Sequence, residues 1–257
     1  LAEMYSNTGA PFSASELNTT DKSLKSKTFQ PMHGTFEAYI DSIGAASENT
    51  LPGQNGRAGV VPSTSNPSKS YLFDANGIEY TQLIEKGLGG ACFFYQIASV
   101  YLSDDRIGTN LALEDRTHHW DEAFGYFGAP EDYPNHTGEL GLLAKYANGR
   151  ESVLGTGTAI MDAYIRGRAA LVNGDEDAVQ AARTTLLMEF QRALGGTAIH
   201  YFNGANANFG DDAIRNHELS EAIAFTRALR YVPAEDAMLT PQQIDDILVE
   251  INEETNL

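Results

Sequence analysis

The amino-acid sequence predicts an all-α protein made of two pseudo-symmetric helical bundles. Three observations predict this class. From Thr35 onward, apolar residues recur every three to four positions, which is the period of an amphipathic helix. No stretch of useful length alternates apolar and polar residues as a half-buried strand does. Four short blocks of the first half also reappear in the same order in the second half, as an internal duplication would produce.

The duplication sets the expected domain organisation. A chain of 257 residues fits one large domain or two small ones. We expect a first helical bundle in residues 1–150, which includes a long loop at 46–75. A second bundle in residues 151–257 should end in an acidic helix, because residues 234–254 carry seven acidic residues and no Lys or Arg. The repeated parts themselves cover roughly residues 24–127 and 150–231.

Three helices are predicted in the first half. Phe36–Ala46 is short and amphipathic, and Glu79–Leu102 is long and mostly apolar. Asp115–Phe127 follows and is expected to stop at Gly128. The loop at 46–75 is rich in Gly, Pro, Ser and Asn, which favour turns over regular structure.

The second half is predicted to contain five helices, delimited by glycine and proline. In the last of them, Thr240 is the expected N-cap and Pro241 the first helical residue. A Gly-Gly pair at 195–196 interrupts the helical pattern, and close helix packing or a kink would explain it. The predicted segments are Ser152–Leu171, Glu176–Leu194, Thr197–Phe209, Ile214–Tyr231 and the helix that begins at Thr240.

Charge and cysteine content exclude several functions. Lys and Arg total 17 against 35 Asp and Glu, so the net charge is −18. A nucleic-acid partner is excluded, since no basic stripe can displace phosphate counterions, and so is direct docking on anionic lipid. Cys92 is the single cysteine, so no intramolecular disulfide or Cys-based zinc site forms. No apolar run is long enough to span a membrane.

The repeated blocks include residues with metal-binding chemistry. Arg116, His118 and Glu122 recur as Arg215, His217 and Glu221 with unchanged spacing. The other three block pairs are Glu37–Ile40 with Asp162–Ile165, Lys86–Gly90 with Arg192–Gly196, and Ser103–Asp105 with Gly210–Asp212.

A spacing of four residues puts each histidine and glutamate on one helix face, one turn apart. Imidazole and carboxylate together suit iron, zinc or manganese. Two such helices would supply His118, Glu122, His217 and Glu221 if their faces converge. His119 makes a second His-x-x-Glu pair with Glu122. Further ligand candidates are Glu79, Glu85 and Asp121.

Two simpler interpretations of the same residues stay open. A histidine and a glutamate four residues apart also form an ordinary helix-surface pair, worth about 0.2–0.5 kcal/mol. A duplicated Arg-His-Glu set also suits a structural network that ties two bundles together. Catalytic motifs are missing from the sequence: it contains neither the GxSxG nucleophile motif nor the HExxH zinc-protease motif.

Three segments resemble a known family. They are LFDANGIEYTQLIEKGLGGACFFYQ at 72–96, HHWDEAFGYFGAP at 118–130 and GTAIHYFNGANANFGDDAIRNHELSEAIAF at 196–225. They look like the domain of unknown function 4856, a group of exported bacterial proteins that includes many lipoproteins. This group is similar in turn to the imelysin-like proteins, whose fold is all-helical and built as two related bundles.

The resemblance implies a site and a location. The imelysin-like signature is Gly-x-His-x-x-Glu on a helix, proposed as a metal site. Here His119 and Glu122 supply His-x-x-Glu, whereas Thr117 stands in place of the glycine. The choice of metal ligand therefore stays open: the internal repeat favours His118, and the family motif favours His119. Imelysin-like proteins are associated with iron-regulated uptake, and some carry a peptidase label. A periplasmic or outer-membrane, cell-surface location is implied, with membrane attachment only through a lipid anchor missing from this chain.

These inferences converge on a non-catalytic exported protein that binds a metal ion, or a small metal-loaded ligand, between two bundles. Iron or zinc is the expected ion. The expected ligands are His118, His119, Glu122, His217 and Glu221, and Arg116 and Arg215 would orient the carboxylates.

Two other functions stay open. A metallopeptidase would need an open coordination position and a general base such as Glu122 or Glu218. A metal-free surface interaction protein would instead use the loop at 46–75. A hydrogen-bonded Arg-His-Glu network with no room for an ion would favour this last function.

Overall fold

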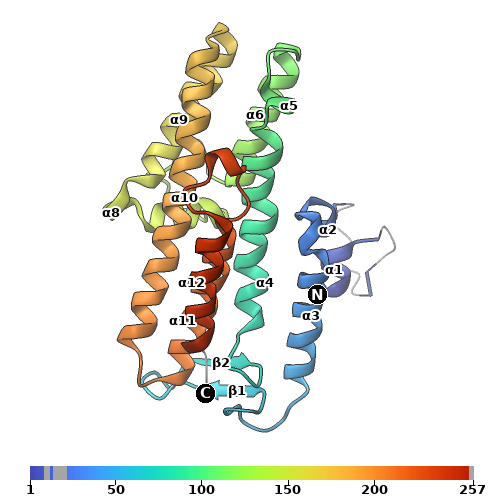
Figure 1. Ribbon diagram of the computed structural model, residues 1–257, viewed down its shortest axis with the longest axis vertical. Coiled ribbons are helices and arrows are strands. Elements are labelled where there is room, and N and C mark those ends of the chain that lie inside the picture. The colour runs from blue at the N-terminus through green and yellow to red at the C-terminus, as the bar shows by residue number, and fades with distance from the viewer. Residues whose placement is uncertain (9–11, 14–21, 255–257) are drawn as a thin grey trace.

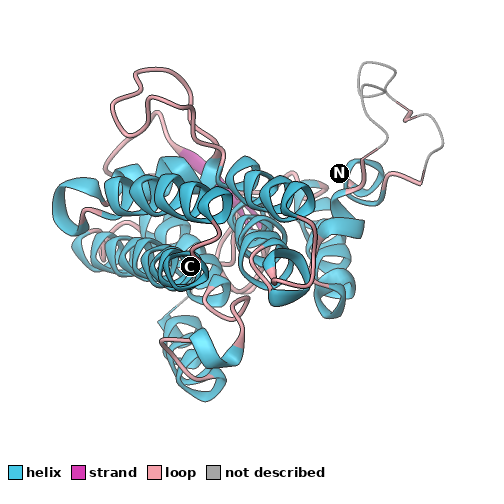
Figure 2. Ribbon diagram, turned by 90° about the horizontal axis from the view of Figure 1, so that it is seen from above, coloured by secondary structure: helices cyan, strands magenta, loops and turns pink. Residues whose placement is uncertain are grey.

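The computed structural model describes residues 1–8, 12–13 and 22–254. Within these residues the chain is mainly helical with one short β-hairpin, so the predicted all-α class is confirmed. The long helices run roughly along the longest axis of the molecule (Figure 1), and from above several of them are seen nearly end-on (Figure 2). No described helix combines the length and the apolar character needed to cross a lipid bilayer.

The elements follow one another along the chain as short and long helices, with the hairpin inserted between the third and fourth α-helices. They are α1 (Ala2–Ser6), α2 (Leu24–Lys27), η2 (Gln30–Met32), α3 (His33–Ser47), β1 (Gly59–Pro62), β2 (Ser70–Phe73), α4 (Tyr80–Leu88), η3 (Gly89–Phe94), η4 (Gln96–Tyr101), α5 (Asp104–Ile107), α6 (Leu113–Phe127), α7 (Leu142–Gly149), α8 (Glu151–Leu154), α9 (Thr156–Asn173), α10 (Glu176–Ala207), α11 (Asp212–Ala228), η5 (Ala234–Asp236) and α12 (Pro241–Glu254).

Helix ends lie close to the predicted positions where the sequence supplies a capping residue. α6 ends at Gly128, which has φ 75° and so takes the left-handed conformation that favours glycine. α12 begins after Thr240, whose Oγ1 accepts a hydrogen bond from Gln243 N at 3.2 Å. Gln243 Oε1 in turn accepts from Thr240 N at 2.9 Å, which completes a reciprocal capping box.

The predicted interruption at Gly195-Gly196 is wrong, because α10 continues through both residues. Packing explains the glycine at position 196. A Cβ added at Gly196 would lie 2.7 Å from Leu154 Cδ1. A Cβ at Gly90 would likewise lie 2.6 Å from Ala228 Cβ, where the helical segment of η3 crosses α11. These glycines allow helices to approach closely.

The sequence predicts a loop without strands at 46–75, and the structure corrects this prediction, because two short strands lie within the segment. β1 and β2 pair antiparallel, with Gly59 opposite Phe73 and Pro62 opposite Ser70. Each strand has four residues, and Pro62 lies at the end of β1, so neither gives a readable alternating pattern. The hairpin packs against α11, and it lies at the lower end of the molecule in Figure 1.

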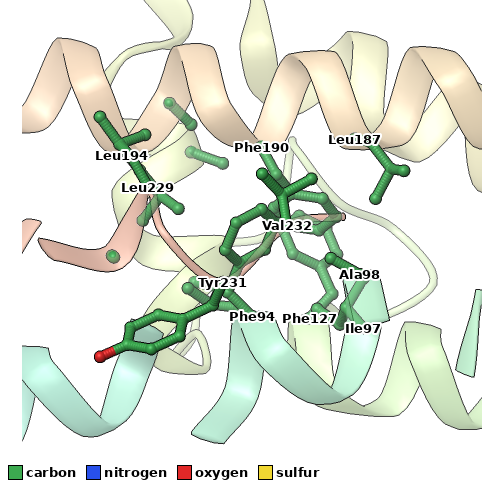
Figure 3. Close-up of a cluster of buried hydrophobic side chains, with 14 of the residues drawn as sticks. Phe94, Ile97, Ala98, Phe127, Leu187, Phe190, Leu194, Leu229, Tyr231 and Val232 are labelled. Carbon is green, nitrogen blue, oxygen red and sulfur yellow. The ribbon is translucent and has the colours of Figure 1, made fainter. Parts of the chain in front are cut away.

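One cluster of buried apolar side chains joins the helices. Phe190 of α10 lies at its centre, with ring centroids 5.8 Å from Phe94 of η3 and 5.4 Å from Phe127 of α6 (Figure 3). Residues of both sequence halves therefore share this cluster. The division into two bundles and their origin by duplication stay predictions.

Candidate functional site

The first predicted His–Glu pair lies on the surface of α6. His118 Nε2 is 3.6 Å from Glu122 Oε2, and the two side chains are 68% and 37% exposed. Solvent screens such a pair, which then contributes little to stability. In this environment the pair matches the ordinary helix-surface interpretation.

His119 is held by α5 rather than by its neighbouring histidine. Its Nδ1 lies 2.8 Å from the Arg106 carbonyl oxygen, and its Nε2 lies 3.3 Å from Arg106 Nη1. These partners assign a tautomer in which Nδ1–H donates and Nε2 accepts. His119 therefore joins α5 to α6.

The second predicted pair belongs to a buried group of charged side chains, Glu79, Lys86, His217 and Glu221, which we name the His217 cluster. His217 Nδ1 lies 2.6 Å from Glu79 Oε2, and His217 Nε2 lies 3.4 Å from Glu221 Oε2. Lys86 Nζ is 3.9 Å from Glu221 Oε1. The side chains of Glu79, Lys86 and Glu221 are at most 8% exposed, and that of His217 is 20% exposed.

Two contacts position the cluster. Glu79 directly precedes α4, and its backbone N–H donates to Ser220 Oγ on α11 at 2.9 Å. This bond fixes the start of α4 beside the helix that carries His217. From the other side, the Tyr71 ring of β2 stacks on the His217 ring, with centroids 4.1 Å apart and planes 17° apart. The start of α4 and strand β2 thus lie on two sides of the imidazole that α11 carries.

Asp211 fastens the hairpin to the same helix. Its Oδ2 accepts hydrogen bonds from Ser63 Oγ at 2.7 Å, from Ser65 N at 2.8 Å and from Ser65 Oγ at 2.7 Å. Its Oδ1 accepts from Ile214 N, so the same carboxylate caps α11. Burial by itself raises the pKa of Asp211, but these hydrogen bonds outweigh it and hold the pKa well below the usual range.

The His217 cluster carries an uncompensated charge when its histidine is neutral. Glu79 and Glu221 each contribute −1 and Lys86 contributes +1, so their sum is −1. Burial raises the pKa of Glu221, while His217 and Lys86 lower it. An uncompensated charge is costly inside a protein.

An unsatisfied oxygen lies next to the cluster. Gln82 Nε2 is 3.4 Å from Glu79 Oε1, whereas Gln82 Oε1 is buried and has no hydrogen-bond partner among the described residues. Buried polar atoms without partners are uncommon. This oxygen adds acceptor capacity beside Glu79.

The two arginines of the repeated blocks bind other groups. Arg116 makes a bidentate salt bridge with Glu176 at the start of α10 and donates from Nε to the Ile107 carbonyl oxygen at 2.7 Å. Arg215 lies 2.7 Å from Asp212 and donates to the Phe209 carbonyl oxygen at 3.0 Å. These contacts stabilise the ends of helices. The expected role of Arg116 and Arg215, to orient the carboxylates of a metal site, stays a prediction.

The structure does not gather the five predicted ligands into one site. α6 lies beside α5 and η4, whereas α11 begins beside the hairpin at the opposite end of the molecule (Figure 1). In the part of the chain that the structure describes, no group of three or more His, Cys, Asp or Glu side chains has the arrangement of a metal site. The second pair alone lies in a buried, organised environment.

The sequence predicted three of the five residues that form this site, His217 included, and did not predict the other two. His217 and Glu221 came from the repeated block, and Glu79 was among the further ligand candidates. Lys86 lies in another repeated block, which carries no histidine or carboxylate and therefore gave no sign of a metal site. Tyr71 lies in the strand that the sequence did not predict, so its stacking on His217 had no local signal.

Comparison with known proteins places the chain in one family. No curated protein and no solved structure matches it. A family profile described as "Domain of unknown function (DUF4856)" matches residues 1–257, the whole length of the chain. The chain therefore belongs to the DUF4856 family.

Proposed function

We propose that this chain is a non-catalytic binding protein that takes up a divalent metal ion at the His217 cluster in exchange for a proton. One observation carries the proposal: the imidazole lies between two buried carboxylates, 2.6 Å from Glu79 and 3.4 Å from Glu221. Histidines that bind metals commonly donate their other N–H to a carboxylate, which fixes the tautomer. Glu79 has this relation to His217.

The proposed ligands follow from that tautomer. With its proton on Nδ1, His217 presents the Nε2 lone pair toward Glu221, so Nε2 and a Glu221 oxygen are the two protein donors. Imidazole and carboxylate suit zinc, iron(II) or manganese(II). Only two protein donors imply that water completes the coordination, and we therefore propose a weak, exchangeable site.

Lys86 opposes a cation at this position, because its ammonium group lies 3.9 Å from the same Glu221 carboxylate. Glu85 moderates the conflict. Its Oε1 is 2.6 Å from Lys86 Nζ, so this carboxylate, whose own side chain is 53% exposed, compensates the charge of the buried ammonium group. Removing the Lys86 charge should accordingly tighten metal binding.

The exported, lipid-anchored location implied by the sequence resemblance is part of the proposal, but the metal argument does not depend on it. The metal-free interaction protein remains the second candidate, and the specific observation that favours it is the Lys86–Glu221 contact. In that case Lys86, and not a metal ion, would be the cation beside the Glu221 carboxylate. The peptidase alternative has no supporting geometry on the described residues.

Equilibrium dialysis against Zn²⁺, Fe²⁺ and Mn²⁺ tests the proposal. The wild type should bind about one ion per chain, H217A and E221Q should bind at least about tenfold more weakly, and K86M should bind more tightly. H118A is the matched control, because it removes a histidine with the same spacing to a glutamate and should change nothing. Absence of binding up to about 1 mM ion, or loss of binding in H118A alone, would contradict the proposal.

A further inference from the structure

A separate cleft lies between α6 and α9, outside the His217 cluster. Its volume is about 500 Å³, which falls within the range of small-molecule sites. Its apolar walls come from two helices. We name it the Trp120 cleft, and its larger apolar lining residues are Trp120, Phe124, Met161, Tyr164, Ile165 and Val172.

The rim of the Trp120 cleft exposes apolar side chains. Ile165 is 57% and Val172 is 56% exposed, although both belong to the otherwise well-packed helix α9. Trp120 at the base is held rigidly, because its indole N–H donates to the Tyr164 carbonyl oxygen at 3.0 Å. A contiguous apolar hollow of this kind gains free energy when an apolar group covers it.

Three charged side chains also line the cleft, and their balance is negative. Arg168 Nε donates to Asp121 Oδ1 at 2.8 Å, so these two charges compensate each other. Glu131 is exposed and has no ion-pair partner among the described residues. The remaining charge of the cleft is therefore that of the Glu131 carboxylate. The net charge of the whole chain, −18, adds a long-range field of the same sign.

We propose that the Trp120 cleft binds a small amphipathic cation, with an aromatic or aliphatic body against the apolar walls and a protonated amine facing Glu131. The walls account for the apolar part of this ligand and the unpaired carboxylate for its charge. A carboxylate ligand is disfavoured, because it would meet Glu131 while Arg168 is already paired with Asp121.

Three probes of nearly equal size separate the apolar contribution from the charge: 4-phenylbutylamine, 4-phenylbutanol and 4-phenylbutyrate. Trp120 is the only tryptophan of the chain, so its fluorescence, excited where a phenyl group does not absorb, reports on this cleft alone. At neutral pH and low salt, all three should bind through the shared phenylbutyl group. The ammonium compound should bind about 2- to 5-fold more tightly than the alcohol, as expected for one solvent-accessible charge pair. The carboxylate should bind most weakly.

Two variants and one control assign the effect. E131Q should abolish the preference for the amine while leaving the affinity for the alcohol unchanged. E139Q is the control, since Glu139 is exposed in the same connecting segment but does not line the cleft. A169F should abolish saturable binding of all three probes, because Ala169 lines the cleft, and its exposed position leaves the core unchanged.

Several outcomes would overturn the proposal: no saturable response to any probe, tighter binding of the carboxylate than of the amine, an unchanged preference in E131Q, or unchanged binding in A169F. Equal urea midpoints of the variants and the wild type verify that A169F and E131Q are folded. The metal experiment uses other residues, so either proposal can fail without the other.

Discussion

Gly167 should not tolerate even a methyl group, although it lies in the middle of α9. A Cβ at this position would lie 2.1 Å from Trp120 Cζ2, 2.3 Å from Trp120 Cη2 and 3.0 Å from Ala182 Cβ. Trp120 is 1% exposed, and its indole hydrogen bond fixes the ring. The ring therefore cannot shift cheaply to make room.

The magnitude follows from two opposing effects in G167A. Replacing glycine by alanine inside a helix contributes about 1 kcal/mol of stability. Overpacking a closed core costs typically 1–3 kcal/mol, and contacts this short place the cost near about 3 kcal/mol. We expect a net loss of about 2 kcal/mol, which lowers the melting temperature of a chain of this size by about 4–8 °C.

Gly125 provides the matched control. It lies inside α6, and a Cβ at this position would have no atom within 4 Å, so G125A should gain about 0.5–1 kcal/mol from helix propensity. Urea unfolding followed by Trp120 fluorescence and by far-ultraviolet circular dichroism measures both variants. The packing account is refuted if G167A is as stable as the wild type, or if G125A loses as much stability as G167A.

Three further predictions concern titratable groups. D211N should lower the free energy of unfolding by about 1–3 kcal/mol at neutral pH, because an amide cannot accept hydrogen bonds from Ser63 and Ser65 as the carboxylate does. Since the folded pKa of Asp211 is depressed, the stability that its carboxylate contributes to the wild type should disappear as the pH falls below 3.8. Equal acid sensitivity of D211N and the wild type in urea titrations would contradict this prediction. Burial raises the pKa of Glu221 above its usual value of 4.5, so the stabilising contribution of its proton is present below that pH and is lost as the pH rises through the folded pKa. E221Q should therefore gain stability relative to the wild type as the pH rises above 4.5, and a constant or falling difference would refute the assignment. Burial raises the pKa of the Cys92 thiol to about 11, so Ellman's reagent should react slowly with the folded protein and quickly with the protein unfolded in urea. Rapid reaction of the folded protein would contradict this prediction, because it would show that the thiol is accessible.

Much of the fold follows from local signals. The end of α6 at Gly128 and the start of α12 after Thr240 follow directly from backbone conformation and capping chemistry. The continuity of α10 through Gly195-Gly196 does not follow from local signals, because the close contact that favours glycine at position 196 is with Leu154. That contact joins positions far apart in sequence, so no window around the glycines contains it. The hairpin was not predicted, because strands of four residues are too short to show the alternation of apolar and polar residues.

The candidate site was predictable only in part for the same reason. The spacing of His217 and Glu221 on one helix is a local property and was found correctly. The identical spacing of His118 and Glu122 carried the same signal, yet that pair is exposed and the other is buried. Burial of His217 comes from Glu79 and Tyr71, more than a hundred positions away in the chain. Sequence spacing could therefore propose both pairs but could not distinguish them.

The exchange of a proton for a metal ion at His217 is the central claim, and the pH dependence of metal affinity tests it most directly. Zinc affinity should be measured by dialysis from about pH 5.5 to about pH 8, because metal ligands must be deprotonated and metal affinity therefore depends on pH. We expect the affinity of the wild type and of H118A to rise with pH, because the imidazole must lose a proton to coordinate, and H217A to bind weakly throughout. An affinity that does not change with pH, or that rises equally in H217A, would contradict the claim.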